Sequence, residues 1–215
     1  MSANIRHVGV SGSSAWTKLK YVARIGGGAG FPPEEQGQTG NELPFCKVNA
    51  LESSTSDGIL SAPWDTVSSA TAEKLGAHIF KPGSTVFAKV GAALLLNRFR
   101  QINCRACLDN NKMGLEPDQS RVSPRYLMYA LSTKDLSIVA NPGAVPSVNA
   151  SQIAEEKIVC PPVLEQTRIA NFLDEQMARI NALIAEKERL VESLREYRQS
   201  WLSGLLRSPP GGDVA

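Results

Sequence analysis

The sequence contains little of what usually carries catalysis or covalent cross-links. Among its 215 residues there are only four Cys and two His. Four Cys in a chain of this length do not indicate a disulfide scaffold. Cys104 and Cys107 have the spacing of metal ligands, but no second such pair and no neighbouring His pair completes a set of four. We therefore predict no metal site.

Long apolar runs and a strong excess of charge are also missing. No apolar run reaches about 18 residues, so no membrane-spanning helix is predicted. The first ten residues, M-S-A-N-I-R-H-V-G-V, have no apolar signal core. The formal net charge is only +2, with the small positive excess in residues 1–160. Charge alone therefore does not indicate nucleic-acid binding.

Three motif fragments fall short of an active site. Gly26–Gly30 is followed by Pro32-Pro33 and lacks both G-x-G-x-x-G and G-K-[ST], which favours a flexible turn over a phosphate loop. Asn141–Ala144 lacks the second proline and the aromatic of the N-P-P-aromatic motif of DNA amino-methyltransferases. Pro117-Asp118 lies too far from Glu155–Lys157 to indicate a nuclease motif. We predict no catalytic residues.

A long helix is the strongest signal in the sequence. After Pro161-Pro162 neither Pro nor Gly occurs until Gly204, and most residues between them favour helix. Apolar residues recur there at alternating steps of four and three, interrupted only by Gln176 and Lys187, which is a heptad pattern. The apolar members of this seam are Ile169, Leu173, Ile180, Leu183, Leu190, Leu194, Tyr197 and Trp201.

A single helix cannot bury such a seam by itself. It must either lie along its own domain as a surface helix or pair with another helix. With a length of roughly 60 Å it far exceeds the mean globular helix, which favours an arm used for association. We predict that the seam residues form a dimer or partner interface.

The same stretch carries a family resemblance. P-P-V-L-E-Q-T-R-I-A-N-F-L-D-E-Q, which begins at Pro161, is followed by I-x-x-L-I-x-x-K-E-x-L and L-R-E-Y-R-Q-S-W-L. This resembles the conserved region of specificity (S) subunits of type I restriction-modification systems. Weaker matches precede it, in L-P-F-C-K-V from Leu43, G-A-A-L-L-L-N-R from Gly91 and N-K-M-G-L-E-P from Asn111.

The resemblance implies a half-length S subunit with one target-recognition domain and one spacer helix. Full-length relatives hold two such units, whose helices pair antiparallel and place two domains on a split DNA target. The implied partners are double-stranded DNA, a DNA methyltransferase (M) subunit, a motor-nuclease (R) subunit and a second copy of the chain. S-adenosylmethionine, ATP and Mg²⁺ are expected only on the partner subunits. The implied setting is the bacterial cytoplasm.

The predicted fold class is α+β, a mixed globular domain followed by one long coiled-coil helix. We expect a disordered N-terminus at 1–15, a target-recognition domain at 16–160, the spacer helix at 161–207 and a flexible tail at 208–215. Within the domain, Thr85–Val90 and Gly91–Phe99 are predicted to form a hairpin, and Ser123 to cap a helix.

Basic and amide side chains are the candidate DNA contacts, because Arg and Asn read base edges whereas Lys more often meets phosphate. They are Lys47, Lys89, Arg98, Arg100, Arg105, Asn110, Asn111, Lys112, Arg121 and Arg125. The segments 98–100 and 110–112, which flank predicted turns, are the strongest candidates. Taken singly, each is equally consistent with a solvated surface residue. The alternatives to DNA recognition are a coiled-coil interaction module without DNA binding, a standalone enzyme, or an inactive truncated remnant of an S subunit.

Overall fold

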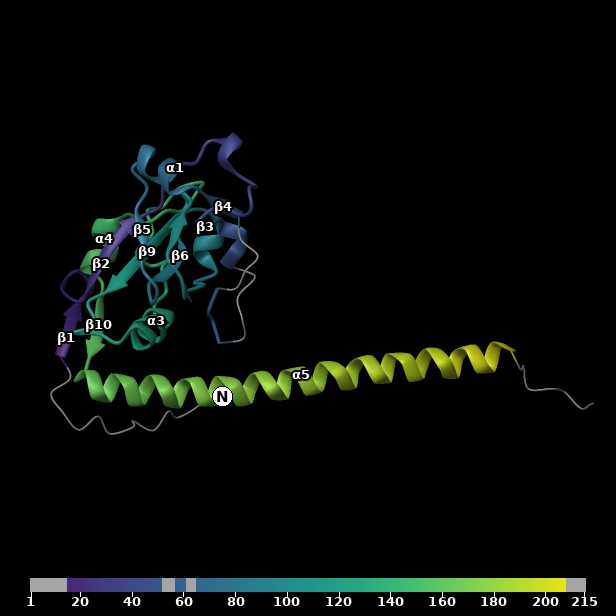
Figure 1. Cartoon of the computed structure of the whole chain (residues 1–215). Helices are drawn as coiled ribbons and strands as arrows, with labels where there is room; N and C mark the ends of the chain where they lie inside the picture. Colours follow the sequence, from purple (N-terminus) through teal and green to yellow (C-terminus); the bar gives the residue numbers. More distant parts are fainter. Residues whose placement is uncertain (1–14, 52–56, 61–64, 208–215) are drawn as a thin grey trace, which may run out of the picture. The chain divides into compact units, whose positions relative to one another are not determined.

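A computed structural model describes residues 15–51, 57–60 and 65–207 (Figure 1). The predicted N-terminal segment, apart from Ala15, and the predicted tail at 208–215 lie outside the described residues. The chain divides into two compact units, Met1–Leu173 and Asp174–Ala215. The predicted class is confirmed: a mixed α+β fold is followed by a long helix.

Short strands and helices alternate through the first unit. The strands are β1 Ala15–Lys18, β2 Ala23–Gly27, β3 Leu43–Cys46, β4 Asp65–Val67, β5 Ile79–Phe80, β6 Thr85–Ala88, β7 Arg100–Gln101, β8 Ala106–Leu108, β9 Lys112–Pro117 and β10 Lys157–Cys160. The α-helices are α1 Ser69–Lys74, α2 Ala92–Leu95, α3 Pro124–Ser132, α4 Ala150–Glu155 and α5 Val163–Arg207. The 3-10 turns are η1 Leu19–Tyr21, η2 Pro33–Glu35 and η3 Val48–Leu51.

The strands form three sheets. Two of them have four strands, in the orders β2-β9-β6-β7 and β4-β3-β8-β5, and the third pairs β1 with β10. The first sheet is antiparallel throughout, whereas β3 and β8 pair in parallel in the second. Figure 1 shows β9 beside β6 in the first sheet, with β2 beside α4.

The middle strands of the first sheet are covered on both faces. All four residues of β6 are buried. Phe87 belongs to a core shared with α3, while Val86 and Ala88 face a second core shared with β3 and β8. On β9, a Cβ at Gly114 would lie 2.4 Å from the ring of Phe80, so glycine makes room there for the aromatic ring.

One expectation about local structure is wrong. Residues 91–99 do not form the second strand of a hairpin, because α2 begins after Gly91 at a φ of 75° and Asn97 adopts a φ of 49°. The antiparallel partner of β6 on that side is β7 instead. Ser123 precedes α3 as predicted, but its side chain makes no capping hydrogen bond.

The long helix is confirmed as α5. Its first turns belong to the first unit, where Ala170 is buried and Ile169 packs against the core. No described helix is long and apolar enough to span a membrane.

Candidate nucleic-acid interface

A tight turn between β8 and β9 brings several predicted DNA contacts together. The amide of Asp109 donates to the carbonyl oxygen of Cys46 at 3.2 Å, and the amide of Lys112 donates to that of Asp109 at 3.0 Å. The amide of Lys89 donates to the carbonyl oxygen of Asn111 at 2.8 Å. The turn is therefore held by the last residue of β3 and the residue after β6 as well as by its own strands.

The glycine-rich segment packs against this turn. The amide of Gly28 donates to the carbonyl oxygen of Lys112 at 3.0 Å. A Cβ at Gly28 would lie 1.9 Å from the carbonyl oxygen of Asp109, so only glycine allows this approach. Gly26 and Gly27 are part of β2. The prediction of a flexible turn is wrong for these residues, because the segment is a strand end packed against another backbone.

Four polar residues lie in the turn or in the segments hydrogen-bonded to it, and we call them the turn cluster: Lys47, Lys89, Asn110 and Asn111. Asn110 and Asn111 are exposed. Lys89 is half-buried, and its Nζ lies 3.5 Å from where a Cβ on Gly27 would stand. Two exposed amides with amines on neighbouring segments suit a nucleic acid, because amides pair with base edges and ammonium groups with phosphates.

Lys47 already has a partner within the domain. Its Nζ lies 2.5 Å from Oδ2 of Asp65, and this hydrogen bond is the largest cause that lowers the pKa of the Asp65 carboxyl. A DNA phosphate would have to share the amine of Lys47 with Asp65 or displace Asp65 from it.

Lys112, by contrast, is buried. Its side chain is 0% exposed, and Nζ lies 2.8 Å from Sγ of Cys46. The prediction that Lys112 lies on the surface as a DNA contact is wrong. On β9 the residues 112, 114 and 116 alternate onto one face, and that face is covered by the second sheet rather than by water.

Arg98 and Arg100 lie at the edge strand of the first sheet instead of in the turn cluster. Burial, and then the nearby charge of Arg98, lower the pKa of Arg100. Nη1 of Arg100 donates to the carbonyl oxygen of Phe99 at 2.9 Å, while its buried Nε has no partner among the described residues. Two neighbouring guanidinium groups suit a phosphate, but the buried Nε of Arg100 is not accessible to one.

The remaining predicted arginines differ in how many contacts they make within the domain. Nη2 of Arg125 donates to the carbonyl oxygen of Asp57 at 2.5 Å and to Oη of Tyr129 at 3.2 Å, and its guanidinium lies 5.0 Å from the Tyr129 ring centroid. Arg105 is exposed beside β8. Arg125 therefore contributes to packing between α3 and the segment before Gly58.

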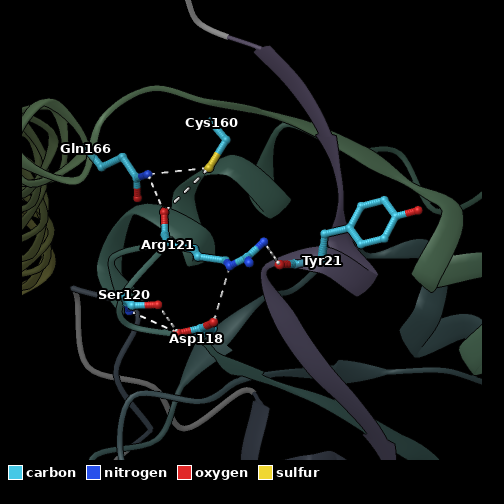
Figure 2. A network of polar contacts seen from close by, with 6 residues as sticks. All are labelled: Tyr21, Asp118, Ser120, Arg121, Cys160 and Gln166. Atoms are coloured by element: carbon cyan, nitrogen blue, oxygen red, sulfur yellow. Dashed lines mark hydrogen bonds and ion pairs between the residues drawn. The ribbon is translucent and has the colours of Figure 1, made fainter.

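Arg121 belongs to a network at the start of α5. Figure 2 shows its guanidinium between Tyr21 and Asp118, with Nη1 donating to the carbonyl oxygen of Tyr21 at 3.3 Å. Nε of Arg121 lies 3.5 Å from Oδ2 of Asp118. The hydroxyl of Ser120 donates to Oδ1 of Asp118 at 2.6 Å, which helps to lower the pKa of that carboxyl.

Gln166 is a buried structural residue that composition and spacing did not identify. It is 0% exposed, and its Oε1 accepts from the amide of Ser123 at 2.8 Å. Its Nε2 donates to the carbonyl oxygen of Arg121 at 2.9 Å and contacts Sγ of Cys160 at 3.4 Å (Figure 2). It also donates to the carbonyl oxygen of Pro161 at 2.7 Å. The only signal for it was the P-P-x-x-E-Q signature, and the structure now gives that signature a physical reason.

The predicted seam splits between the two units. Ile169 packs against the core of the first unit, and with Leu173 it lines a groove of about 430 Å³ that also contains Trp16 and Tyr129. The members from Ile180 onward are exposed in the single chain, Trp201 by 58%. These are Ile180, Leu183, Leu190, Leu194, Tyr197 and Trp201.

Groups with catalytic chemistry are few in the described chain. Nε2 of His78 pairs with Oε1 of Glu116 beside Phe80, and within the described ranges no group of three or more His, Cys, Asp or Glu gathers as metal ligands do. Burial raises the pKa of Cys107 to about 11, so this thiol stays protonated at neutral pH.

Comparison with known proteins agrees with this architecture. The family model described as "Type I restriction modification DNA specificity domain" matches residues 15–193. Among curated proteins, no significant sequence match is found. The chain therefore belongs to the family of type I restriction modification DNA specificity domains.

Three solved structures share the fold. One comes from work on complex assembly and conformational transition of the type I R-M system, with a TM-score of 0.68, 19% identity, and coverage of 94% of this chain and 47% of that chain. The HsdS subunit from Thermoanaerobacter tengcongensis has a TM-score of 0.64, 20% identity and coverage of 97% and 47%. The type I S subunit from M. genitalium has a TM-score of 0.57, 14% identity and coverage of 93% and 47%. The chain thus spans about half the length of the solved structures it matches.

Proposed function

We propose that this chain recognises DNA sequence for a type I restriction-modification complex and performs no chemical step itself. The family match over residues 15–193 carries the proposal. The exposed amides of the turn cluster and its half-buried amines support it, because they are the two kinds of group that sequence reading requires.

The partners we propose are an M subunit and an R subunit in the bacterial cytoplasm. S-adenosylmethionine, ATP and Mg²⁺ would be bound by those subunits. The exposed apolar face of α5 from Ile180 onward supports association, because each fully buried apolar side chain contributes roughly 1.5–3 kcal/mol.

We further propose an antiparallel homodimer through α5. The seam positions are symmetric about Ala185, so that a two-fold axis there places Ile169 opposite Trp201 and Leu173 opposite Tyr197. Two copies of a chain that spans about half of its structural relatives would supply both halves of a full-length S subunit.

A two-fold dimer presents the same recognition surface twice. The target would therefore be palindromic and interrupted, with two short inverted half-sequences on either side of base pairs that are not read. Half-sites on one face of DNA fall about 34–36 Å apart for each helical turn that separates them.

Methylome sequencing of cells that express this chain with its cognate M subunit tests the proposal. The expected result is one interrupted, palindromic methylated sequence that is lost without the chain. Methylation at a sequence unaffected by the chain would contradict DNA recognition. An asymmetric target with two unrelated halves would contradict the homodimer alone.

A further inference from the structure

Lys112 and Cys46 form a buried polar pair that touches no solvent. Nζ of Lys112 lies 2.8 Å from Sγ of Cys46, and both residues are 0% exposed. Lysine is almost never fully buried without a partner, because its ammonium group loses hydration. The thiol of Cys46 is the partner of this ammonium group.

The environment of the pair favours uncharged forms. Burial raises the pKa of the Cys46 thiol and lowers the pKa of the Lys112 ammonium, and each shift is partly offset by the other member of the pair. The two side chains thus act mainly as a short hydrogen-bonded strut between β3 and β9, which belong to different sheets.

The backbones of the same two residues hold the turn that carries the exposed amides. The carbonyl oxygen of Cys46 accepts from the amide of Asp109, and the amide of Lys112 donates to the carbonyl oxygen of Asp109. Asn110 and Asn111 follow directly and are exposed. A change in the distance between Cys46 and Lys112 must therefore move the turn, because Asp109 is tied to both.

We propose that Lys112 and Cys46 are positioning residues, which set the place where Asn110 and Asn111 meet DNA and so determine base discrimination without contacting DNA. The inference rests on the proposed function, since it assigns part of the sequence specificity to the turn cluster. It predicts that discrimination between sequences depends on the pair, whereas electrostatic binding to any duplex does not.

The test compares Lys112→Met, which keeps the length of the side chain and removes its amine, with Lys81→Met, which alters an exposed lysine. The full chain selects sequences from a pool of duplexes with a randomised core. Affinity is then measured for the selected duplex and for a scrambled duplex. We expect Lys112→Met to lower the ratio of the two affinities by about tenfold or more, and to leave affinity for the scrambled duplex within about twofold. Lys81→Met should leave the ratio unchanged.

A second readout does not depend on DNA. Amide hydrogen exchange at Asp109 and Lys112 should accelerate in Lys112→Met, while exchange in the middle of β6 stays slow. If Lys112→Met fails to fold, Cys46→Ser and Cys46→Val replace it. Serine keeps an acceptor for Nζ, so Cys46→Ser should keep the wild-type affinity ratio and the slow exchange. Cys46→Val should lower the ratio and accelerate the exchange.

The outcomes separate the two proposals. A folded Lys112→Met with unchanged exchange at Asp109 overturns the positioning role, whatever the DNA results. Equal behaviour of Cys46→Ser and Cys46→Val overturns it too, and so does an unchanged affinity ratio. If the wild-type chain, alone and with its M subunit, selects no sequence, the proposed function fails while the exchange experiment still decides whether the pair holds the turn.

Discussion

At the scale of residues, the domain separates surface groups that can meet DNA from polar groups that hold the fold. Asn110, Asn111 and Lys89 remain available around one turn, while Lys112 and Gln166 are fully buried. Residue type alone does not make this distinction, because lysine and glutamine are usually solvated. Substitutions at the two kinds of position should therefore have different consequences.

The first prediction contrasts a base-reading group with a phosphate-binding group. Asn111→Ala should weaken binding to the selected duplex by about 1–3 kcal/mol and leave binding to a scrambled duplex nearly unchanged. Arg98→Ala should weaken both and reduce the slope of log affinity against log salt by about one. Fluorescence anisotropy at several salt concentrations measures both effects. Asn171→Ala, an exposed change on α5, is the control, and an Asn111→Ala that weakens both duplexes equally would contradict a reading role.

The second prediction concerns acid stability. Hydrogen bonds from Lys18 and Lys20, each with Nζ 2.5 Å from a carboxylate oxygen, lower the pKa of Glu155 to about 2 from 4.5. Because the pKa in the folded state is depressed, this pairing stabilises the fold fully above pH 4.5, and the contribution is lost as pH falls toward 2. The gain is small, because the carboxylate is exposed. Carboxyl NMR titration should report the low pKa, and Glu155→Gln should flatten the change in melting temperature over that range of pH; an ordinary pKa near 4.5 would contradict the prediction.

At the scale of elements, α5 begins as part of the domain and continues as an exposed amphipathic helix. Gln166 satisfies the backbone of the segment before α3 and of the double proline, so that the helix begins in a fixed place on the first unit. The exposed seam begins further along, at Ile180.

The third prediction addresses this anchor. Gln166→Leu should lower the free energy of unfolding by about 2–3 kcal/mol, because the amide of Ser123 and two carbonyl oxygens lose their buried partner. Urea unfolding followed by circular dichroism measures the loss. Gln199→Leu, at an exposed position of the same helix, should change it by less than about 0.5 kcal/mol. Equal effects of the two substitutions would show that the hydrogen bonds of Gln166 contribute little.

The fourth prediction concerns the seam. Leu183→Asp with Leu190→Asp should convert the homodimer to monomers, because charges would replace apolar side chains at the centre of the helix pair. Multi-angle light scattering measures the mass. Ala178→Asp with Ala185→Asp places the same charges on the opposite face and should leave a dimer. A wild-type chain that is monomeric at micromolar concentration, both alone and with the M subunit, would refute the assembly.

At the scale of the whole molecule, the proposed homodimer links the length of α5 to the DNA target. In that antiparallel pair the helices would hold the two domains apart and would set the distance between half-sites. Each half-sequence would be read within one domain. Spacer length and half-sequence should therefore vary independently.

The fifth prediction separates these two properties. Removing one heptad from the middle of α5 keeps the phase of the seam and shortens each arm by about 10 Å. The permitted spacer should shorten by about three base pairs, while both half-sequences stay the same. Methylome sequencing of cells with the shortened chain and the M subunit shows the target. A shortened chain that methylates the original spacing would contradict the measuring role of the helices.

The sequence by itself was enough for features that depend on local periodicity. The span of α5 follows from Pro161-Pro162, a continuous run of helix formers and a regular heptad seam, all of which are local. The α+β class was predicted on the same basis, and so was a strand at 85–90, which the structure has at 85–88. The family signature likewise lies in one continuous stretch.

Only the tertiary structure decided which polar residues are buried and which strands pair. Alternation along β9 predicts two faces, but it does not show that a second sheet covers the face of Lys112. The partner of β6 is β7, because Gly91 and Asn97 adopt positive φ and direct the intervening residues into a short helix. Gln166 contacts Ser123 and Arg121, more than 40 residues away in the chain. Periodicity records only neighbours in sequence, whereas burial and pairing depend on contacts between distant segments, which exist only once the chain has folded.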